Sequence, residues 1–396
     1  MVQTVVDQAR DSVDGDEVVR VAQRLVRIPS ENPSGDTREV CAAIVDELAP
    51  AGFKTEIFEA GDGHDSVIAT YDFPTPGPTL ILNGHIDVVP VGDTAGQWQH
   101  DPVGGEIDGG RLYGRGAMDM KGQVAGLLVA ARSVAQCGAA LGGRIVFTAV
   151  ADEEQGGKRG AGALIEAGKI DGDAVLVVEA SSGGVTLAHR GMSFFELTTH
   201  GRSAHASVPE NGVNAVLIMA EALLSLRSVQ MRHTPHPLLG SPSVAIGTII
   251  EGGRKANVIP DTCKASLDIR HVPGMNRDEV LEDLREHFRA ADLPVDIESI
   301  LWAESGETSP DEEIVRVTME AHEREFGEVP VLRGERAATD GWWFTNRAEL
   351  PTIMALGPGT VKEVHIVDES IDVGELQRYS RVYADVIARF LTTVSV

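Results

Sequence analysis

The chain has 396 residues, a formal net charge of −26, and 42% hydrophobic and 24% charged residues. This length suits two domains, and the composition is that of a globular protein with a large core. The acidic balance argues against nucleic acid or an anionic membrane surface as a partner, because both favour a basic face. It does not exclude a small anionic substrate, which needs only a local arginine or a metal ion.

The cysteines and the N-terminal segment give further limits. There are three cysteines and no C-x-x-C pair, so neither a disulfide framework nor a structural zinc site is indicated. Residues 1–20 contain several aspartates and no apolar core, which is unlike a signal peptide. The most apolar helical stretch, residues 124–135, contains Arg132 and is too short to span a bilayer. We therefore expect a soluble, cytoplasmic protein.

The first half of the chain alternates between helical and strand-like patterns, which indicates an α/β fold. Asp36, with Glu39 three residues later, predicts a capped helix start. A long irregular stretch covers residues 91–116, and loops of this length are usually functional. The predicted elements are helices at 16–27, 36–48, about 120–137 and 160–167, and strands at 53–58, 66–71, 79–83, 144–150 and 174–178.

The second half begins with a different order of elements. Strand, helix, strand, strand, helix and strand patterns follow one another, which is the order of a ferredoxin-like unit. They occupy residues 193–199, 211–227, 243–250, 261–270, 277–290 and 295–300. After Trp302 a helix, a strand and a final helix at 312–326, 352–356 and 373–393 return the chain to α/β character. We predict an α/β domain with a mixed central sheet, residues 1–189 and 303–396, and an inserted α+β domain, residues 190–302.

Three predicted strands are followed by histidine or acidic residues. His85 follows the apolar strand at 79–83, Glu153 and Glu154 follow the strand at 144–150, and Glu179 follows the strand at 174–178. In an open α/β sheet, ligands bind beyond the carboxyl ends of parallel strands, so these groups can meet although they are distant in sequence. Two further residues fit the same group, Asp119 at the start of a helix and His365 in a loop.

Several carboxylates at one point are costly unless cations neutralise them. Two divalent ions would do so, with Asp119 bridging them. The ligand sets would be His85, Asp119 and Glu179 for one ion, and Asp119, Glu154 and His365 for the other. Mixed histidine and carboxylate donors suit zinc, with cobalt or manganese as alternatives, better than calcium. An open position would remain for water, and Glu153, bound to neither ion, could act as general base.

Each motif alone also has an ordinary explanation. Asp152-Glu153-Glu154 is typical of a solvated acidic turn, and a lone Glu179 can pair with a lysine or arginine. The glycine-rich run at 114–122 could be a simple turn. Their joint appearance at strand ends is much harder to explain in this way.

Taken together, the motifs resemble the signature of one metallohydrolase family, which includes acetylornithine deacetylase, succinyl-diaminopimelate desuccinylase, aminoacylase and carboxypeptidase G. The similar segments are His85-x-Asp87-x-Val89-Pro90, Gly114-Arg115-Gly116-Ala117-x-Asp119-Met120-Lys121-Gly122, Asp152-Glu153-Glu154, Glu179 and His365-x-x-Asp368-Glu369. They occur in the right order over nearly the whole chain. The resemblance supports the ligand sets and implies that Asp87 is the partner of His85 and Glu153 the base. It also implies that the inserted domain is a lid that mediates homodimer formation.

The resemblance extends to the inserted domain. His205, within Gly201–Ser207, matches a histidine that reaches an active site, often in the partner subunit, and stabilises the tetrahedral oxyanion. Asn257 and Arg270 match positions that bind the substrate carbonyl and carboxylate. Without the resemblance, His205 is an ordinary loop histidine, and Arg270 could equally be a surface residue at a strand edge.

Some positions differ from the family pattern, in which glycine is common at Gln123 and proline is common at Ala180. Trp342 and Trp343 are also unusual, and could be core aromatics or could line a pocket for an apolar acyl group. None of these differences removes a ligand.

The function that follows is a two-metal amidohydrolase that cleaves the amide bond of an N-acyl amino acid, as a deacetylase or desuccinylase does. A dipeptidase or carboxypeptidase on the same scaffold is the alternative, because these enzymes also cleave an amide beside a carboxylate. A catalytically silent binding protein is a third reading. Loss of Glu153 or of a metal ligand would be its signature, and all of these residues are present.

Overall fold

The computed structural model describes residues 2–392 and divides into two compact units. Unit 1 comprises Met1–Leu187, Glu307–Arg333 and Thr339–Val396, and unit 2 comprises Ala188–Gly306 and Gly334–Ala338. The second unit is therefore formed mainly by one continuous stretch inserted into the first. The predicted functional division into residues 1–189 with 303–396, and 190–302, stays a prediction.

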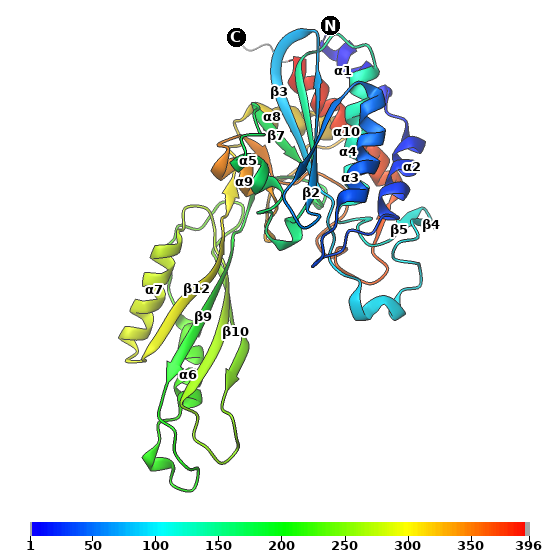
Figure 1. The fold of residues 1–396 in the computed structure, drawn as a ribbon. Helices are drawn as coiled ribbons and strands as arrows, with labels where there is room; N and C mark the ends of the chain where they lie inside the picture. The colour runs from blue at the N-terminus through cyan, green and yellow to red at the C-terminus, as the bar shows by residue number, and fades with distance from the viewer. Residues whose placement is uncertain (1, 393–396) are drawn as a thin grey trace. The chain divides into compact units, whose positions relative to one another are not determined.

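Unit 1 is built on a six-stranded mixed sheet in the order β1-β2-β6-β3-β7-β15 (Figure 1). Strands β6, β3, β7 and β15 run parallel to one another, whereas β2 pairs in antiparallel fashion with β1 on one side and with β6 on the other. The strands are β1 (Lys54–Glu59), β2 (Asp65–Asp72), β3 (Thr75–His85), β6 (Gly142–Val150), β7 (Ala174–Val177) and β15 (Thr352–Ile353). The predicted α/β fold with a mixed central sheet is confirmed.

Helices cover both faces of this sheet. In β3, alternate side chains face opposite sides, so Leu80 and Leu82 belong to one hydrophobic core and Ile81 to another. The first core is formed with α1 (Val2–Asp11), α2 (Gly15–Val26), α3 (Arg38–Leu48), α4 (Lys121–Gln136), α8 (Glu313–Phe326) and α10 (Val373–Thr392). The second is formed with α5 (Ala161–Glu166) and α9 (Gly341–Arg347). The central strand is thus buried on both faces, as its apolar run predicts.

Trp342 and Trp343 lie in the second core. They are 7% and 8% exposed and stack with ring centroids 3.9 Å apart. The indole nitrogen of Trp343 donates to the Gly156 carbonyl at 3.1 Å. A Cβ atom at Gly162 would lie 2.8 Å from the Trp343 ring, so the close approach of α5 requires glycine there. Of the two interpretations of these tryptophans, the structure supports core aromatics.

Unit 2 has the predicted ferredoxin-like order of elements. Its four strands form an antiparallel sheet in the order β10-β11-β9-β12. The elements are β9 (Met192–His200), α6 (Ala215–Ser225), β10 (Ser243–Gly252), β11 (Thr262–Arg270), α7 (Arg277–Ala290) and β12 (Val295–Ala303). Side chains of α6 and α7 share a core with one face of the sheet, including Phe195 and Leu267. The sheet therefore has one buried face, as its alternating pattern requires.

Several details differ from the sequence predictions. The helix predicted to begin at Asp36 begins at Arg38, and Asp36 pairs instead with the Arg38 side chain. The stretch 91–116 is not wholly irregular, because β4 (Glu106–Asp108) and β5 (Arg111–Tyr113) form a small sheet with β16 (Ser370–Asp372). Helix α1 and strands β8 (Val185–His189), β13 (Gly306–Glu307) and β14 (Leu332–Glu335) were not predicted.

Between residues 2 and 392, no helix combines the length and the apolar character needed to cross a membrane.

Candidate metal centre

Three neighbouring parallel strands bring chemically active side chains to one end of the unit 1 sheet. Strand β3 ends at His85, whose Cα pairs with that of Val150 at the end of β6. On the other side of β3, Asn83 pairs with Val177, the last residue of β7. Because these carboxyl ends lie side by side, the residues that follow them converge.

A sharp turn after β6 presents the acidic pair Glu153 and Glu154. Asp152 adopts a left-handed backbone conformation with φ 69°, which aspartate tolerates better than most residues. Its carboxylate accepts a hydrogen bond from the Arg159 backbone N–H at 2.8 Å. The local sequence therefore ends the strand abruptly and starts a short helical turn at Glu153.

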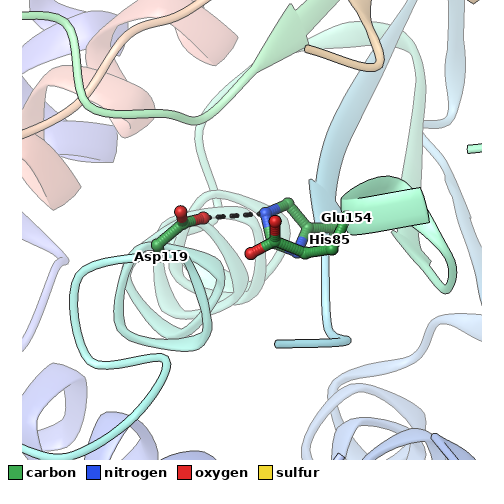
Figure 2. Close-up of side chains that lie close together, drawn as sticks. All are labelled: His85, Asp119 and Glu154. Carbon is green, nitrogen blue, oxygen red and sulfur yellow. Dashed lines mark hydrogen bonds and ion pairs between the residues drawn. The ribbon is translucent and has the colours of Figure 1, made fainter. Parts of the chain in front are cut away.

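His85 is buried at 1% exposure and faces two carboxylates through Nε2. This atom lies 2.9 Å from Oδ1 of Asp119 (Figure 2). It also lies 3.4 Å from Oε1 of Glu179. The other ring nitrogen, Nδ1, lies 2.9 Å from the backbone carbonyl of Asp87 and 3.6 Å from its carboxylate. The carbonyl thus orients the ring and leaves Nε2 directed at the two acidic side chains.

His365 faces the second oxygen of the same Asp119 carboxylate. Its Nε2 lies 3.0 Å from Oδ2 of Asp119 and 3.0 Å from Oε1 of Glu154. The side chain of His365 is 46% exposed, and its backbone has φ 61°. Each oxygen of Asp119 is therefore directed at a different histidine, the arrangement expected of a carboxylate that bridges two ions.

Asp87 holds the turn that carries the acidic pair. Its two carboxylate oxygens accept the backbone N–H groups of Glu153 at 3.1 Å and of Glu154 at 3.2 Å. Nδ2 of Asn32 donates to the same carboxylate at 2.8 Å. The carboxylate of Glu153 lies 4.0 Å from its histidine neighbour, His85 Nε2, whereas that of Glu154 lies 3.0 Å from His365 Nε2. Glu153 and Glu154 thus have different surroundings although they are adjacent in sequence.

The pKa values reflect the crowding of negative charge. Burial and the Asp119 carboxylate raise the pKa of Glu179 to about 7, and burial raises the pKa of Glu153 well above its usual range. Hydrogen bonds to Asp119 and Glu154 raise the pKa of His365 to about 10. Nearby positive charge stabilises the ionised form of these crowded carboxylates, so the cluster favours a bound cation.

The donor set fits divalent cations. One ligand atom from each of His85, Asp119 and Glu154 lies within 4.8 Å of the other two (Figure 2). Imidazole nitrogens with carboxylate oxygens suit zinc, cobalt or manganese. His85 contacts Asp119 and Glu179, and His365 contacts Asp119 and Glu154. The division of these residues into two ligand sets stays a prediction.

The structure also shows residues that had no role in the sequence interpretation. Asp340 is buried beside the cluster, and burial raises the pKa of its carboxyl group to about 7. Asn32 is buried and bonded to Asp87, although 55 residues separate them. Glu369 and Arg115, which belong to quoted motifs, form a buried ion pair behind Asp119. No local sequence pattern links either pair, so only the tertiary structure could reveal them.

The residues predicted to bind substrate lie in unit 2. His205 and Val258 form an isolated antiparallel bridge, and the backbone N–H of Ala206 donates to the Asn257 carbonyl at 3.0 Å. His205 and Asn257 are therefore neighbours, and both are exposed. Arg270 lies at the other end of β11, where its guanidinium forms two hydrogen bonds with Asp268, at 2.8 and 3.0 Å.

A mixed α/β sheet with histidine and carboxylate donors at its strand ends is typical of a metallohydrolase. Comparison with protein families narrows this class, because the peptidase family M20/M25/M40 matches residues 81–389. The chain belongs to this family. The resemblance seen in the motifs is confirmed.

Individual relatives agree with this assignment. A succinyl-diaminopimelate desuccinylase of Methylobacterium radiotolerans is 30% identical over 390 residues, which cover 94% of this chain and 96% of the relative. An M20 family metallo-carboxypeptidase from Sulfolobus solfataricus has the same fold, with a TM-score of 0.78, 18% identity and coverage of 96% of this chain and 100% of that one. A dinuclear metal binding peptidase from Bacillus subtilis gives a TM-score of 0.72 and 19% identity over 96% of this chain and 99% of that one. At these identities the two solved structures show the fold alone.

Proposed function

We propose that the protein is a two-metal amidohydrolase that cleaves the amide bond of an N-acyl amino acid, of the deacetylase or desuccinylase type. Zinc is the expected ion, with cobalt or manganese able to replace it. The observation that carries the proposal is the Asp119 carboxylate, whose oxygens lie 2.9 Å from His85 and 3.0 Å from His365. The 30% identity to a desuccinylase over nearly the full length supports the choice of an acylated amino acid.

In this proposal the residues have separate tasks. When bound, divalent ions would polarise the amide carbonyl of the substrate and lower the pKa of a water molecule. Glu154 and Glu179 would hold the ions together with the histidines and Asp119. Glu153, whose Oε2 is 4.0 Å from His85 Nε2, would take the proton of the attacking water and deliver it to the leaving amide nitrogen. The Asp87 carboxylate would keep Glu153 in place by accepting the backbone N–H of Glu153.

The residues proposed to bind substrate lie far apart within one chain. Strand β11 runs from Thr262, near His205 and Asn257, to Arg270, and its nine residues span about 26 Å at roughly 3.3 Å per residue. An N-acyl amino acid is much shorter, so one lid cannot bring both ends of β11 to the same substrate. We propose that each site takes His205 and Asn257 from one chain of a homodimer and Arg270 from the other.

Exposed apolar side chains in unit 2 support the homodimer. Leu217 and Leu224 of α6 are 62% and 61% exposed, and Ile249 and Ile250 of β10 are 59% and 52% exposed. Strand β10 also forms an edge of its sheet. Such edges and patches are the usual places for self-association, so two copies could pair here.

A hydrolysis screen tests the substrate class. The purified protein, supplied with zinc or cobalt, is incubated with N-acetyl, N-succinyl, N-formyl and N-carbamoyl amino acids and with dipeptides. The proposal expects the highest kcat/KM for an acylated amino acid. Higher kcat/KM for dipeptides would favour a peptidase, and no hydrolysis by the fully metal-loaded protein would overturn the assignment as an amidohydrolase.

A further inference from the structure

Glu369 lies directly behind the loop that carries Asp119. Its side chain is fully buried, and Oε1 accepts three backbone N–H groups, from Gly116 at 3.0 Å, Met118 at 3.0 Å and Asp119 at 3.1 Å. Oε2 forms an ion pair with Arg115 from the same loop. One carboxylate therefore fixes most of the Gly116–Asp119 backbone, including the residue that supplies the bridging carboxylate.

The same residue also fixes the segment that carries His365. Glu369 is four residues after His365, and its backbone carbonyl accepts the N–H of Gly114 at 3.0 Å. Next to it, Oδ1 of Asp368 accepts the N–H groups of Gln99 and His100 at 2.8 and 3.2 Å. Between residues 360 and 369 the chain has no helix or strand, so these contacts replace regular structure as its anchors.

We propose that Glu369 is a positioning residue that sets the separation of Asp119 and His365. It belongs by sequence to the segment of His365, and its side chain holds the loop of Asp119, so it joins the two pieces of the chain that carry these ligands. The proposal rests on the two-metal centre proposed above. Its specific consequence concerns the ion held by His365, Asp119 and Glu154.

The other ion should depend less on Glu369, because it shares only Asp119 with the segments that Glu369 joins. His85 is the last residue of β3, and Glu179 follows β7 closely, so the central sheet holds both. The Nδ1 atom of His85 is oriented by the carbonyl of Asp87, a contact that does not involve Glu369. Loss of the Glu369 contacts would therefore misplace both Asp119 and His365 at one ion but only Asp119 at the other, so the ion held by His365 should lose more affinity.

The test compares metal binding by wild-type protein and by Glu369→Gln. Metal-free protein is titrated with Co²⁺, and both the calorimetric stoichiometry and the visible Co²⁺ spectrum are recorded. Removing a partner that orients a ligand typically costs roughly 10–100-fold in metal affinity. We expect one Co²⁺ site of Glu369→Gln to lose affinity by this factor, whereas the other site loses much less. If the variant bound Co²⁺ at each site as tightly as the wild type, or lost affinity equally at both sites, the proposal would be overturned.

Glu47→Gln is the matched control. Glu47 is also a buried glutamate, 7% exposed, and it pairs with Arg20, Arg24 and Arg132 in the helical layer. Its substitution should lower the melting temperature without changing either Co²⁺ affinity. A selective loss of one Co²⁺ site in Glu47→Gln as well would attribute the effect to general destabilisation and overturn the proposal.

If Glu369→Gln does not fold, Glu369→Asp provides the same comparison with the charge kept and the side chain one methylene shorter. A clearly larger loss of affinity at one Co²⁺ site than at the other supports the proposal, and unchanged affinities or an equal loss at both sites overturn it. The wild type separates this inference from the proposed function. Wild-type protein that binds a single ion would overturn the two-metal centre itself, whereas two ions bound equally well by wild type and variant would overturn only the role of Glu369.

Discussion

Nδ2 of Asn32 donates a 2.8 Å hydrogen bond to Oδ2 of Asp87, and both side chains are buried. Asp87 in turn accepts the backbone N–H groups of Glu153 and Glu154. Asn32 therefore supports the acidic turn through one intermediate residue. Asn32 comes from the loop after α2, which also pairs with the Asp87 segment through the Glu31–Val88 bridge, whereas the acidic turn follows β6.

Asn32→Ala should lower activity without removing the metal ligands. Without the amide, the Asp87 carboxylate loses one of its hydrogen-bond donors, and the turn with Glu153 becomes less constrained. Mutation of such supporting partners typically costs about 10–100-fold in activity or metal affinity. The measurement is kcat/KM together with metal content. Ser34→Ala is the control, because Ser34 is exposed in the same loop and its hydroxyl donates to the Glu31 carbonyl at the surface. An equal loss there would contradict the explanation.

Metal removal should abolish hydrolysis. Protein purified without chelator is expected to contain up to two divalent ions per chain by elemental analysis, and chelator followed by zinc or cobalt should remove and then restore activity. Asp119→Asn should weaken both ions, because each oxygen of Asp119 faces a different histidine. Full metal content and full activity in Asp119→Asn or in His85→Ala would refute the assignment of the ligands.

Glu153→Gln should separate catalysis from metal binding. Gln is close in shape to Glu but cannot accept a proton from water, and Glu153 is the acidic residue farther from the histidines. General-base catalysis contributes about 10²–10⁴-fold, so kcat should fall by that order while KM and metal content stay nearly unchanged. A parallel loss of metal would mean that Glu153 and Glu154 have exchanged roles.

His205→Ala should keep the fold and the ions but reduce turnover. Loss of one donor to an oxyanion typically costs about 10²–10³ in kcat. If the residue acts across a homodimer, mixing inactive His205→Ala with inactive Glu153→Gln should restore part of the activity, because a mixed dimer contains one complete site. Subunit exchange is checked separately with labelled protein. Proven exchange without recovery of activity would rule out action across the dimer.

Unit 2 should lose stability in mild acid. His271 is buried, and burial, with a smaller effect of nearby His189, lowers its pKa to about 4. Its ring stacks on Trp302 at 4.0 Å, and Nδ1 lies 2.8 Å from the Ser193 hydroxyl. The unfolded chain would bind a proton below about pH 6.5, whereas the folded protein would not, so stability is complete above that pH and falls as the pH drops towards 4.

The maximum effect on the free energy of unfolding follows from the pKa shift of His271, at about 1.4 kcal/mol for each unit of pKa, and amounts to about 3 kcal/mol. Urea unfolding at pH 7 and pH 5 measures it. His271→Gln should have a smaller difference between the two pH values than wild type. His200→Gln, at an exposed histidine of the same unit, should keep the wild-type difference. An unchanged difference in His271→Gln would show that this histidine does not control the acid response.

Sequence patterns predicted the parts of the molecule that depend on nearby residues. Helix α7 begins at Arg277 and ends at Ala290 as predicted, because Asn276 caps it by accepting the Glu279 N–H and its apolar positions recur at helical spacing. The position of His85 at the end of β3 could also be predicted, from the apolar run of the buried strand before it. The α/β class also followed, since alternating strands and helices leave few ways to bury both faces of a sheet.

What could not be predicted depends on contacts between distant residues. Strand β5 is only three residues long, and its pairing with β16 joins Leu112 to Ile371. Helix α1 carries few apolar residues, but Val6 and Ala9 are fully buried in the first core. In both cases the burial that stabilises the element comes from partners far along the chain, so the local pattern gives too little information.

The contact of Trp343 with the two glycines beside it has a consequence for sequence change. A Cβ atom at Gly157 would lie 2.8 Å from the Trp343 indole nitrogen, and one at Gly162 would lie 2.8 Å from the ring carbons. Alanine at Gly162 therefore needs a smaller aromatic or aliphatic side chain at 343, while a smaller residue at 343 alone leaves a cavity. Each of these two substitutions is therefore destabilising when it occurs without the other. These positions should therefore vary together among relatives. A double variant should lose less unfolding free energy than the two single variants lose together.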